Sequence, residues 1–254
     1  MDPTPFYIFG GIALFFAVLL LVSNVKNMRR RKRIVATPTS KIAQAPGTGP
    51  VEINGRIVAG EQGVFTTPIG QRPAVWAKVV VQELRRRGKS STYVTIHQEI
   101  YDRVIYVDDG SGELARVFTE RAHMVLDSKQ VASSGMLRDP QPHVQAFLTQ
   151  RGIATTGWVF NRTLRFTEEV LAPGDQLYAL GPSTRQGGPG GGPFRQGPPG
   201  QLTLQAGPTF DQELILTNKP ESGLVRKLLF PTILGIIFLV AGLGLVVAGL
   251  AAGS

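Results

Sequence analysis

Histidine and cysteine, which often supply nucleophiles and metal ligands, are scarce in this chain. Its 254 residues include no cysteine and three histidines, His97, His123 and His143. Protein metal sites favour ligands at short, regular spacings, whereas these histidines are widely separated. The lack of cysteine excludes disulfide bonds, cysteine-ligated zinc and a thiol nucleophile. We therefore expect no metal site and no cofactor.

The adjacent carboxylates Asp108 and Asp109 could hold a cation or act as an acid–base pair. Neighbouring residues on a strand point to opposite faces, so these two side chains would not converge on one ion. The further oxygen ligands and the late glutamate of a calcium-binding EF-hand loop are missing. Aliphatic runs on both sides of Asp108–Gly112 instead favour a hairpin turn. Since the sequence also lacks a nucleophile elbow, a Walker motif and a kinase motif, we do not expect an enzyme.

Positive charge is concentrated in two clusters, and the formal net charge at pH 7 is +9. The first cluster follows an apolar run and consists of Lys26, Arg29, Arg30, Arg31, Lys32 and Arg33. The second lies at a predicted hairpin tip and consists of Arg85, Arg86, Arg87 and Lys89. The first is typical of a membrane topology signal, and the second is either a solvated turn or an anion-binding site. Because no aromatic residues alternate with these charges, a nucleic-acid partner is not favoured.

Two apolar segments, residues 1–25 and 228–252, are long enough to cross a membrane. Twenty helical residues rise about 30 Å, which matches the hydrocarbon core of a bilayer. A cleaved signal peptide carries its positive charge before the apolar run, whereas here the charge follows it. The basic pair Arg226 and Lys227 precedes the second segment. Because Lys and Arg beside a span stay on the cytoplasmic side, we expect two spans in the cell (inner) membrane, a cytoplasmic domain, and both termini outside.

Small residues recur at every fourth position of the second apolar segment, at Gly244, Ala248 and Ala252. On a helix they form one ridge, against which another helix can pack closely. The ridge predicts packing against the first span or against a second copy of the chain, which would make a homo-oligomer.

Between the spans, alternating apolar and polar residues predict a β-rich domain at residues 51–222, with one helix at residues 138–151. The fold class expected is α+β: a mostly antiparallel, barrel- or sandwich-like soluble domain with one short helix, flanked by two transmembrane helices. Residues 26–50 are expected to form a basic juxtamembrane segment and linker, and residues 223–227 a second juxtamembrane segment. Residues 184–200 are rich in Gly and Pro, which predicts a disordered loop.

Nine runs within this domain are expected to be strands, because their apolar residues alternate or cluster between turn residues. They are residues 51–58, 74–84, 91–100, 104–107, 114–118, 163–171, 176–181, 202–205 and 213–216.

Short motifs occur in a fixed order along the chain: Thr37–Lys41, Gly55 in a strand, Pro73–Trp76, Asp109–Gly112, Glu168-Glu169 with Pro173–Asp175, and Tyr178–Gly181. With two spans flanking a β-rich domain, this order resembles the GIDE, or Beside-a-Membrane (BAM), domain family. The resemblance covers nearly the whole chain and rests on the order of the motifs. Two departures are Ala74, where relatives often have cysteine, and the long Gly/Pro insertion.

Eukaryotic members of that family are mitochondrial E3 ubiquitin ligases whose RING finger follows the second span. A RING finger binds zinc through cysteines, which this sequence lacks, so ligase activity is not expected here. The resemblance implies the membrane part alone, as in RING-less bacterial-type members. In mitochondrial relatives the domain faces the intermembrane space, whereas the charges of this chain favour the cytoplasm.

Together these patterns predict a non-catalytic two-span membrane protein whose β-rich domain binds or scaffolds a protein partner beside the bilayer, in membrane-associated signalling or stress response. One alternative is a module that binds anionic lipid or nucleic acid through its two basic clusters. A second is an accessory component of a ubiquitin-ligase-like system.

Overall fold

The computed structural model describes the chain except residues 1, 135–139, 155–161, 186–199, 220 and 254, and it leaves the side chains of residues 221–228 undescribed. The chain divides into two compact units. A helical unit comprises residues 1–38 and 220–254, and a β-rich unit comprises residues 39–219.

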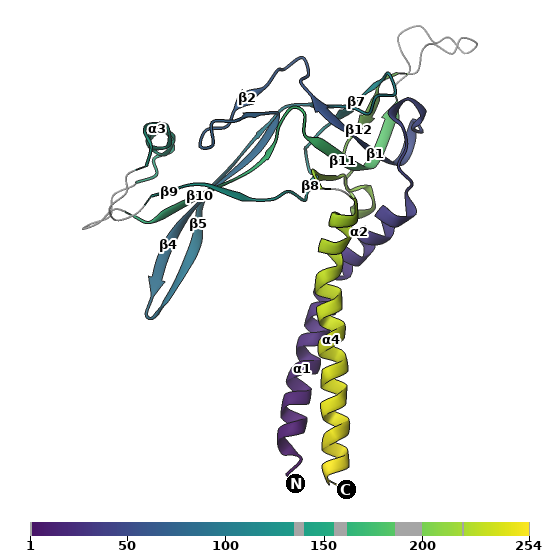
Figure 1. Ribbon diagram of the computed structural model, residues 1–254, viewed down its shortest axis with the longest axis vertical. Coiled ribbons are helices and arrows are strands. Elements are labelled where there is room, and N and C mark those ends of the chain that lie inside the picture. Colours follow the sequence, from purple (N-terminus) through teal and green to yellow (C-terminus); the bar gives the residue numbers. More distant parts are fainter. Residues whose placement is uncertain (1, 135–139, 155–161, 186–199, 220, 254) are drawn as a thin grey trace. The chain divides into compact units, whose positions relative to one another are not determined.

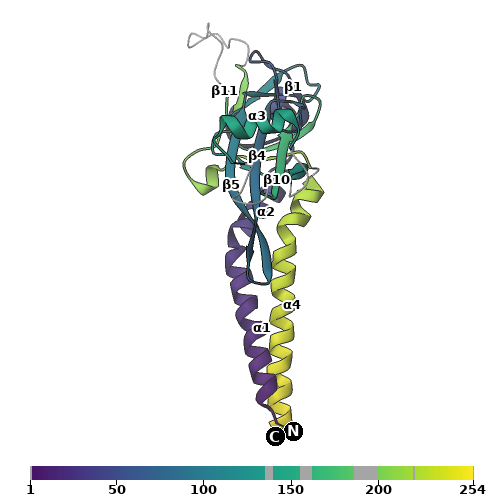
Figure 2. The same cartoon turned by 90° about the vertical axis from the view of Figure 1, so that its left-hand side faces the viewer.

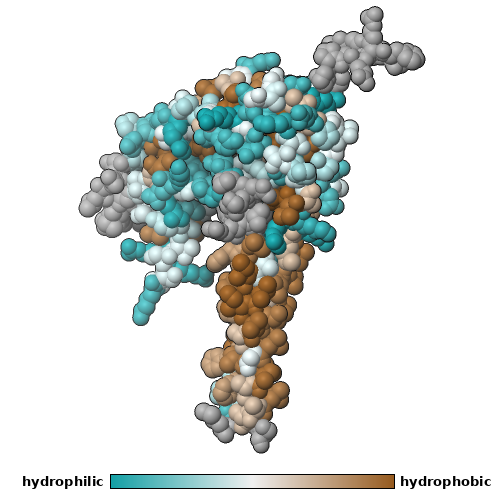
Figure 3. Space-filling model, turned by 45° about the vertical axis from the view of Figure 1, so that its right-hand side comes forward, coloured by the Kyte–Doolittle hydropathy of each residue, from teal (hydrophilic) through white to brown (hydrophobic). Residues whose placement is uncertain are grey.

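The helical unit contains the three helices α1 (Thr4–Ser23), α2 (Val25–Ala36) and α4 (Glu221–Gly253). Two segments, Thr4–Ser23 and Leu229–Ala252, are long and apolar enough to cross a membrane. The helices α1 and α4 run antiparallel, so the two chain ends lie together (Figure 1). Most of their surface is hydrophobic (Figure 3), as expected for helices whose outer faces meet lipid.

Glycines at intervals of seven residues let α1 and α4 approach closely. An added Cβ at Gly242 would lie 2.9 Å from Cγ of Leu14, and one at Gly249 would lie 3.0 Å from Cβ of Phe6. An added Cβ at Gly235 would likewise lie 3.1 Å from the side chain of Leu21 in α1. Small residues seven apart keep one face of a helix against its partner, so this stripe forms the α1–α4 contact.

The predicted ridge Gly244, Ala248 and Ala252 lies on another side of α4. An added Cβ at Gly244 would meet nothing within 4 Å, and Ala248 is exposed. Close packing against α1 therefore uses the stripe of Gly235, Gly242 and Gly249 instead of Gly244. Packing of the ridge against a second copy stays a prediction.

Gly242→Val should loosen the α1–α4 pair, because its Cβ would clash with backbone atoms of α1, and overpacking of this kind costs about 1–3 kcal/mol. We expect the variant to lower the yield of an oxidised disulfide between Cys residues placed by Asn24→Cys and Thr232→Cys, whose native side chains are in hydrogen-bond contact. The chain has no cysteine of its own to compete. Gly244→Val is the matched control and should leave the yield unchanged. Equal losses in both variants would contradict this packing.

Five strands of the β-rich unit close into a barrel, in the order β1-β6-β7-β12-β11 and back to β1. All the pairings around this circle are antiparallel except β12–β7, which is parallel. This is a five-stranded Greek-key barrel of the OB-fold kind. The strands are β1 (Thr48–Val58), β6 (Ile105–Asp108), β7 (Leu114–Val117), β11 (Gln176–Arg185) and β12 (Leu202–Leu204).

The barrel sheet extends past β11 through two short strands, β13 (Ile215–Thr217) and β8 (His123–Met124). Its interior is filled by aliphatic residues from every barrel strand, among them Val51, Ile53, Val107, Ala115, Leu177 and Leu204. Burial of these side chains stabilises the closed barrel by about 1.5–3 kcal/mol for each large aliphatic residue.

A second, four-stranded sheet has the order β5-β4-β10-β9. Helix α3 (Pro142–Gln150) covers one face of this sheet (Figure 2), and Val144, Phe147 and Leu148 pack there against Val79, Val81, Leu164 and Phe166. The strands are β4 (Trp76–Arg87), β5 (Ser90–Asp102), β9 (Lys129–Ser134) and β10 (Leu164–Leu171). Because β4 and β5 lie between β1 and β6 in the chain, and β9 and β10 lie between β7 and β11, two insertions into the barrel build this sheet.

An ion pair at the C-terminal end of α3 fixes this helix to the second sheet. Arg151 donates from Nε and Nη2 to the two carboxylate oxygens of Glu99, at 2.9 and 3.0 Å, and from Nη2 to the hydroxyl of Tyr101. The guanidinium also lies over the ring of Phe147. The hydrogen bonds from Arg151 lower the pKa of Glu99 to about 2 despite partial burial.

The segment expected as a linker, residues 26–50, contains most of helix α2, a short 3-10 helix at Ile42–Gln44 and the start of β1. Its basic part is helix α2, and its polar part belongs to the β-rich unit, where Ile42 and Ala45 are buried in the barrel core. The side chain of Glu52 accepts hydrogen bonds from the hydroxyls of Thr39 and Tyr178. The polar composition of this segment suggested a linker, and it did not reveal that Ile42 and Ala45 are buried in the barrel core.

The predicted α+β, β-rich fold with terminal spanning-length helices is confirmed. The predicted helix at residues 138–151 is α3, which starts at Pro142 and ends at Gln150; residues 138 and 139 lie outside the described part. All nine predicted strands are present with shifted ends, whereas β8, β9 and the pair β2 (Phe65–Thr66) and β3 (Pro73–Ala74) were not predicted. Of the predicted Gly/Pro loop, Thr184 and Arg185 end β11, and residues 186–199 lie outside the described part.

Candidate binding pocket

The three histidines lie in different places of the β-rich unit. His97 Nε2 lies 3.4 Å from Glu99, His143 Nε2 lies 2.9 Å from the carbonyl oxygen of Ile69, and His123 is in β8. Within the described residues, no group of three or more His, Cys, Asp or Glu side chains is placed to hold a metal ion.

Asp108 is the last residue of β6, whereas Asp109 opens the predicted β6–β7 turn. Their carboxylates have separate partners. Asp108 accepts the N–H of Gly110 at 2.8 Å, whereas Asp109 accepts the N–H groups of Ser111 and Ile42. Burial alone would raise the pKa of Asp109, but the hydrogen bonds from Ser111 and Ile42 outweigh it and lower that pKa. These carboxylates hold the turn and the segment that enters β1.

The second basic cluster spans the end of β4 and the following turn. Arg85, Arg86 and Arg87 are strand residues and only Gly88 and Lys89 form the turn, so the predicted tip was too long. Gly88 has a φ of 62°, which suits a tight two-residue turn. All four basic side chains are exposed, and Arg85 pairs with Glu83 at 2.9 Å. Anion binding by this cluster stays a prediction.

Both groups of basic residues next to the predicted spans are helical. Lys26, Arg29, Arg30, Arg31, Lys32 and Arg33 are in α2. Arg226 and Lys227 are in α4, and their side chains lie outside the described part.

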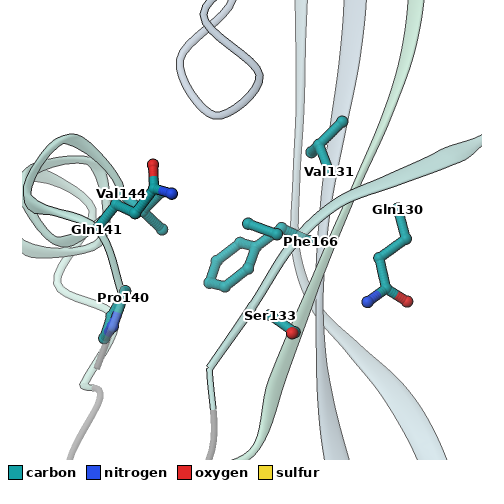
Figure 4. A pocket seen from close by; sticks show the side chains of 8 residues that line it. Gln130, Val131, Ser133, Pro140, Gln141, Val144 and Phe166 are labelled. Carbon is teal, nitrogen blue, oxygen red and sulfur yellow. The ribbon is translucent and has the colours of Figure 1, made fainter. Parts of the chain in front are cut away.

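A pocket of about 320 Å³ lies between β9, β10 and the start of α3. Figure 4 shows the ring of Phe166 pointing from β10 toward Val144 of α3, with Gln130 and Ser133 nearby. The residues that line this pocket carry no charge. The lining segments at residues 130–133 and 140–144 are joined through residues 135–139, which lie outside the described part. We assign no function to this pocket.

A second pocket, here called the Glu168 pocket, has a volume of about 200 Å³ and a charged lining. Glu168 is 1% exposed, although it carries a carboxylate. Its Oε1 accepts the N–H groups of Ile69 and Gly70, both at 3.1 Å. These bonds attach the β2–β3 loop to β10 and fix the direction of the carboxylate.

The other carboxylate oxygen, Oε2 of Glu168, is buried and has no hydrogen-bond partner among the described residues. The same is true of Nε of Arg72. Both atoms flank Gly70, where an added Cβ would lie 2.5 Å from Oε2 and 3.4 Å from Nε. Buried polar atoms are nearly always hydrogen-bonded, so an acceptor and a donor left unpaired around one glycine make this pocket a candidate for binding a polar group.

The remaining charged residues of the lining, Asp127, Lys129 and Asp175, come from two chain segments. Lys129 opens β9, Asp175 lies in the β10–β11 turn, and Asp127 forms an ion pair with Lys219 at 2.5 Å. Asp175 accepts the N–H of Ala172 at 2.9 Å. With both signs of charge present, the lining suits a group that donates and accepts hydrogen bonds better than a bare ion.

The loop that shapes this pocket is closed by its own hydrogen bonds. Thr67 donates its backbone N–H to the carbonyl of Arg72, and its hydroxyl oxygen accepts the N–H of Arg72. Gln71 adopts a φ of 51°, which lets the chain turn back within six residues. The loop therefore presents Gly70 and Arg72 to Glu168 in one fixed arrangement.

Comparison with known protein families, curated proteins and solved structures gave no match. The resemblance to the GIDE/BAM family therefore stays a prediction. Several residues that carry it meet on the barrel: Thr39 and Tyr178 share Glu52, and Lys41 donates to the carbonyl oxygen of Asp109 at 3.1 Å.

Sequence reasoning did not find the Glu168 pocket, although one signal was present. Strand alternation puts Glu168 on the same face of β10 as Leu164 and Phe166, which are both buried. A carboxylate in register with two core residues is rare unless it is paired, so it indicates a structural or binding role.

Removing the Glu168 carboxylate should destabilise the β-rich unit. Glu168→Ala leaves the N–H groups of Ile69 and Gly70 without their acceptor, so we expect the free energy of unfolding to fall by roughly 2 kcal/mol or more. Urea unfolding of the whole chain in detergent, followed by the fluorescence of its two tryptophans, of which Trp76 is in the core, measures this. Glu168→Gln keeps one acceptor and should lose less.

Glu169→Ala is the matched control for that measurement. Glu169 lies on the opposite face of β10 and pairs with Lys78 at 3.9 Å, a long and partly exposed ion pair worth less than about 1 kcal/mol. Equal destabilisation by Glu168→Ala and Glu169→Ala would contradict the role given to Glu168.

Proposed function

We propose that this chain is a non-catalytic binding protein, anchored in a membrane by α1 and α4, whose β-rich unit holds a protein partner through the Glu168 pocket. The observation that carries the proposal is the unpaired acceptor of Glu168 beside the unpaired donor of Arg72 in one pocket. The two helices of spanning length support the anchor.

The size of the pocket favours a side chain over a free small molecule. Pockets for small molecules usually have volumes of about 300–1,000 Å³, whereas this one has about 200 Å³. A carboxamide, as in Asn or Gln, offers an N–H donor for Glu168 and a carbonyl acceptor for Arg72. We infer that a partner inserts such a side chain, with Lys129 and Asn218 at the rim.

Anchoring at both ends of the β-rich unit explains why a small number of contacts with the partner would suffice for binding. A domain tethered at both ends searches a thin layer beside the bilayer, so its effective concentration toward membrane-associated partners is high. The positive charges of α2 favour the cytoplasmic side for the β-rich unit, and the antiparallel α1–α4 pair then puts both termini outside.

The orientation is testable with single cysteines, because the chain has none of its own. Lys129→Cys, at an exposed position of the β-rich unit, should react with a membrane-impermeant maleimide only after the membrane is opened. Asp2→Cys, beyond the other end of α1, should react in intact cells. The reverse pattern would place the β-rich unit outside.

The binding site is testable by photocrosslinking in native membranes. A photoreactive amino acid replacing Lys129 should give one adduct of defined mass, and Glu168→Gln in the same chain should lower its yield several-fold. The same reagent at Lys89, on the distant hairpin turn, serves as the positional control and should not give that adduct. The proposal fails if the Lys129 adduct forms equally well with and without Glu168→Gln.

A further inference from the structure

A groove of about 650 Å³ runs between α2 and α4 inside the helical unit. Apolar side chains of Val25, Met28, Val35 and Leu229 line it. Three cations, Arg29, Arg31 and Lys32, share the lining. Its volume lies within the range of about 300–1,000 Å³ that is typical of ligand sites.

Helix α2 has the pattern of a helix that lies at a membrane surface. Val25, Met28, Lys32 and Val35 follow the spacing of one helix face. Met28 and Val35 are 48% and 67% exposed, although they are apolar. An exposed apolar stripe bordered by arginine and lysine is typical of interfacial helices that contact anionic lipids.

The position of the groove along the spans points to the level of the lipid headgroups. The first spanning segment ends at Ser23, and the second begins at Leu229. The side chain of Asn24 donates to the hydroxyl of Thr232, so the end of the first segment lies beside the start of the second. The groove therefore opens where the hydrocarbon core of a bilayer gives way to its headgroups.

We propose that this groove is a selective binding site for one anionic phospholipid. The phosphate and its headgroup lie against Arg29, Arg31 and Lys32, while an acyl chain follows Val25, Met28 and Leu229. A zwitterionic lipid carries a cation that these three residues repel, so charge complementarity selects an anionic headgroup. The inference rests on the proposed membrane insertion of α1 and α4, and it does not depend on the Glu168 pocket.

The basic residues of α2 differ in what they are free to contact. Arg29, Arg31 and Lys32 are exposed in the groove. Arg30, which does not line the groove, donates to Oδ1 of Asn27 at 3.1 Å. A topology signal requires charge near the span without regard to helix face, whereas a lipid site requires these three positions.

The test uses the full chain in nanodiscs of phosphatidylcholine with one-tenth phosphatidylglycerol, and native mass spectrometry counts the lipids that remain bound. Co-elution with the nanodisc first confirms insertion, and its absence would overturn the membrane anchor itself. We expect phosphatidylglycerol to make up about half of the lipids that remain bound, roughly fivefold its bulk fraction. Inorganic phosphate at equal ionic strength should not displace it, which separates a lipid site from a phosphate site.

Matched variants decide whether the enrichment belongs to the groove. The triple change Arg29→Gln, Arg31→Gln and Lys32→Gln should abolish it. The control, Lys26→Gln with Arg30→Gln and Arg33→Gln, removes the same charge from the same helix and should retain it.

A variant that fills the groove with an uncharged side chain gives a second test, in case the triple variant folds poorly. Val35→Trp fills the groove without changing the charge, and it should also remove the enrichment. The proposal is overturned by equal losses in both triple variants, which would indicate general surface attraction. An inserted wild-type chain that retains phosphatidylglycerol only at its bulk fraction would overturn it as well.

Discussion

A carboxylate removed from water must receive hydrogen bonds, and two buried glutamates show how far the β-rich unit depends on this constraint. Glu52 and Glu168 are each 1% exposed. Both oxygens of Glu52 accept hydroxyl groups, from Thr39 and Tyr178, so this carboxylate joins the chain after α2 to β1 and β11. Glu168 satisfies only one oxygen within the described chain. The first glutamate is thus fully used in holding the fold, whereas the second keeps one oxygen without a hydrogen bond in the described part of the chain.

The topology explains why that capacity lies at the junction of barrel and sheet. Strand β10 pairs Leu171 with Trp76 of β4, and the chain then turns through Asp175 into β11 of the barrel. The β2–β3 loop precedes β4 and carries Arg72 to the same junction. Two insertions into a barrel therefore bring together polar groups that neither would bury alone. Fold alone does not assign function, so the argument for binding rests on the unpaired atoms.

Sequence patterns predicted the helices and strands whose apolar residues recur with a regular spacing. Alternation identified β4, β5, β10 and β11, and helical spacing of Val144, Phe147 and Leu148 identified α3. The closure of the barrel was not predictable, because periodicity indicates which face is buried and does not indicate which strand lies beside it. The Glu168 pocket was missed for the same reason: its carboxylate bonds Ile69 and Gly70, which lie 99 and 98 residues away. The burial of Ile42 in the barrel core was also missed, because the polar residues around it are typical of a linker.

The two helices of spanning length show the same difference between the number of residues of one kind and their positions. Glycine is common throughout α4, yet Gly235, Gly242 and Gly249 contact α1 while Gly244 does not. Six basic residues follow α1, and their number alone predicts orientation. Their distribution around α2 adds a separate property, because Arg29, Arg31 and Lys32 line an apolar groove and Arg30 donates to Asn27. In a membrane the number of charges would therefore bear on which side the β-rich unit occupies, and under our proposal their helix face bears on which lipid the helical unit binds.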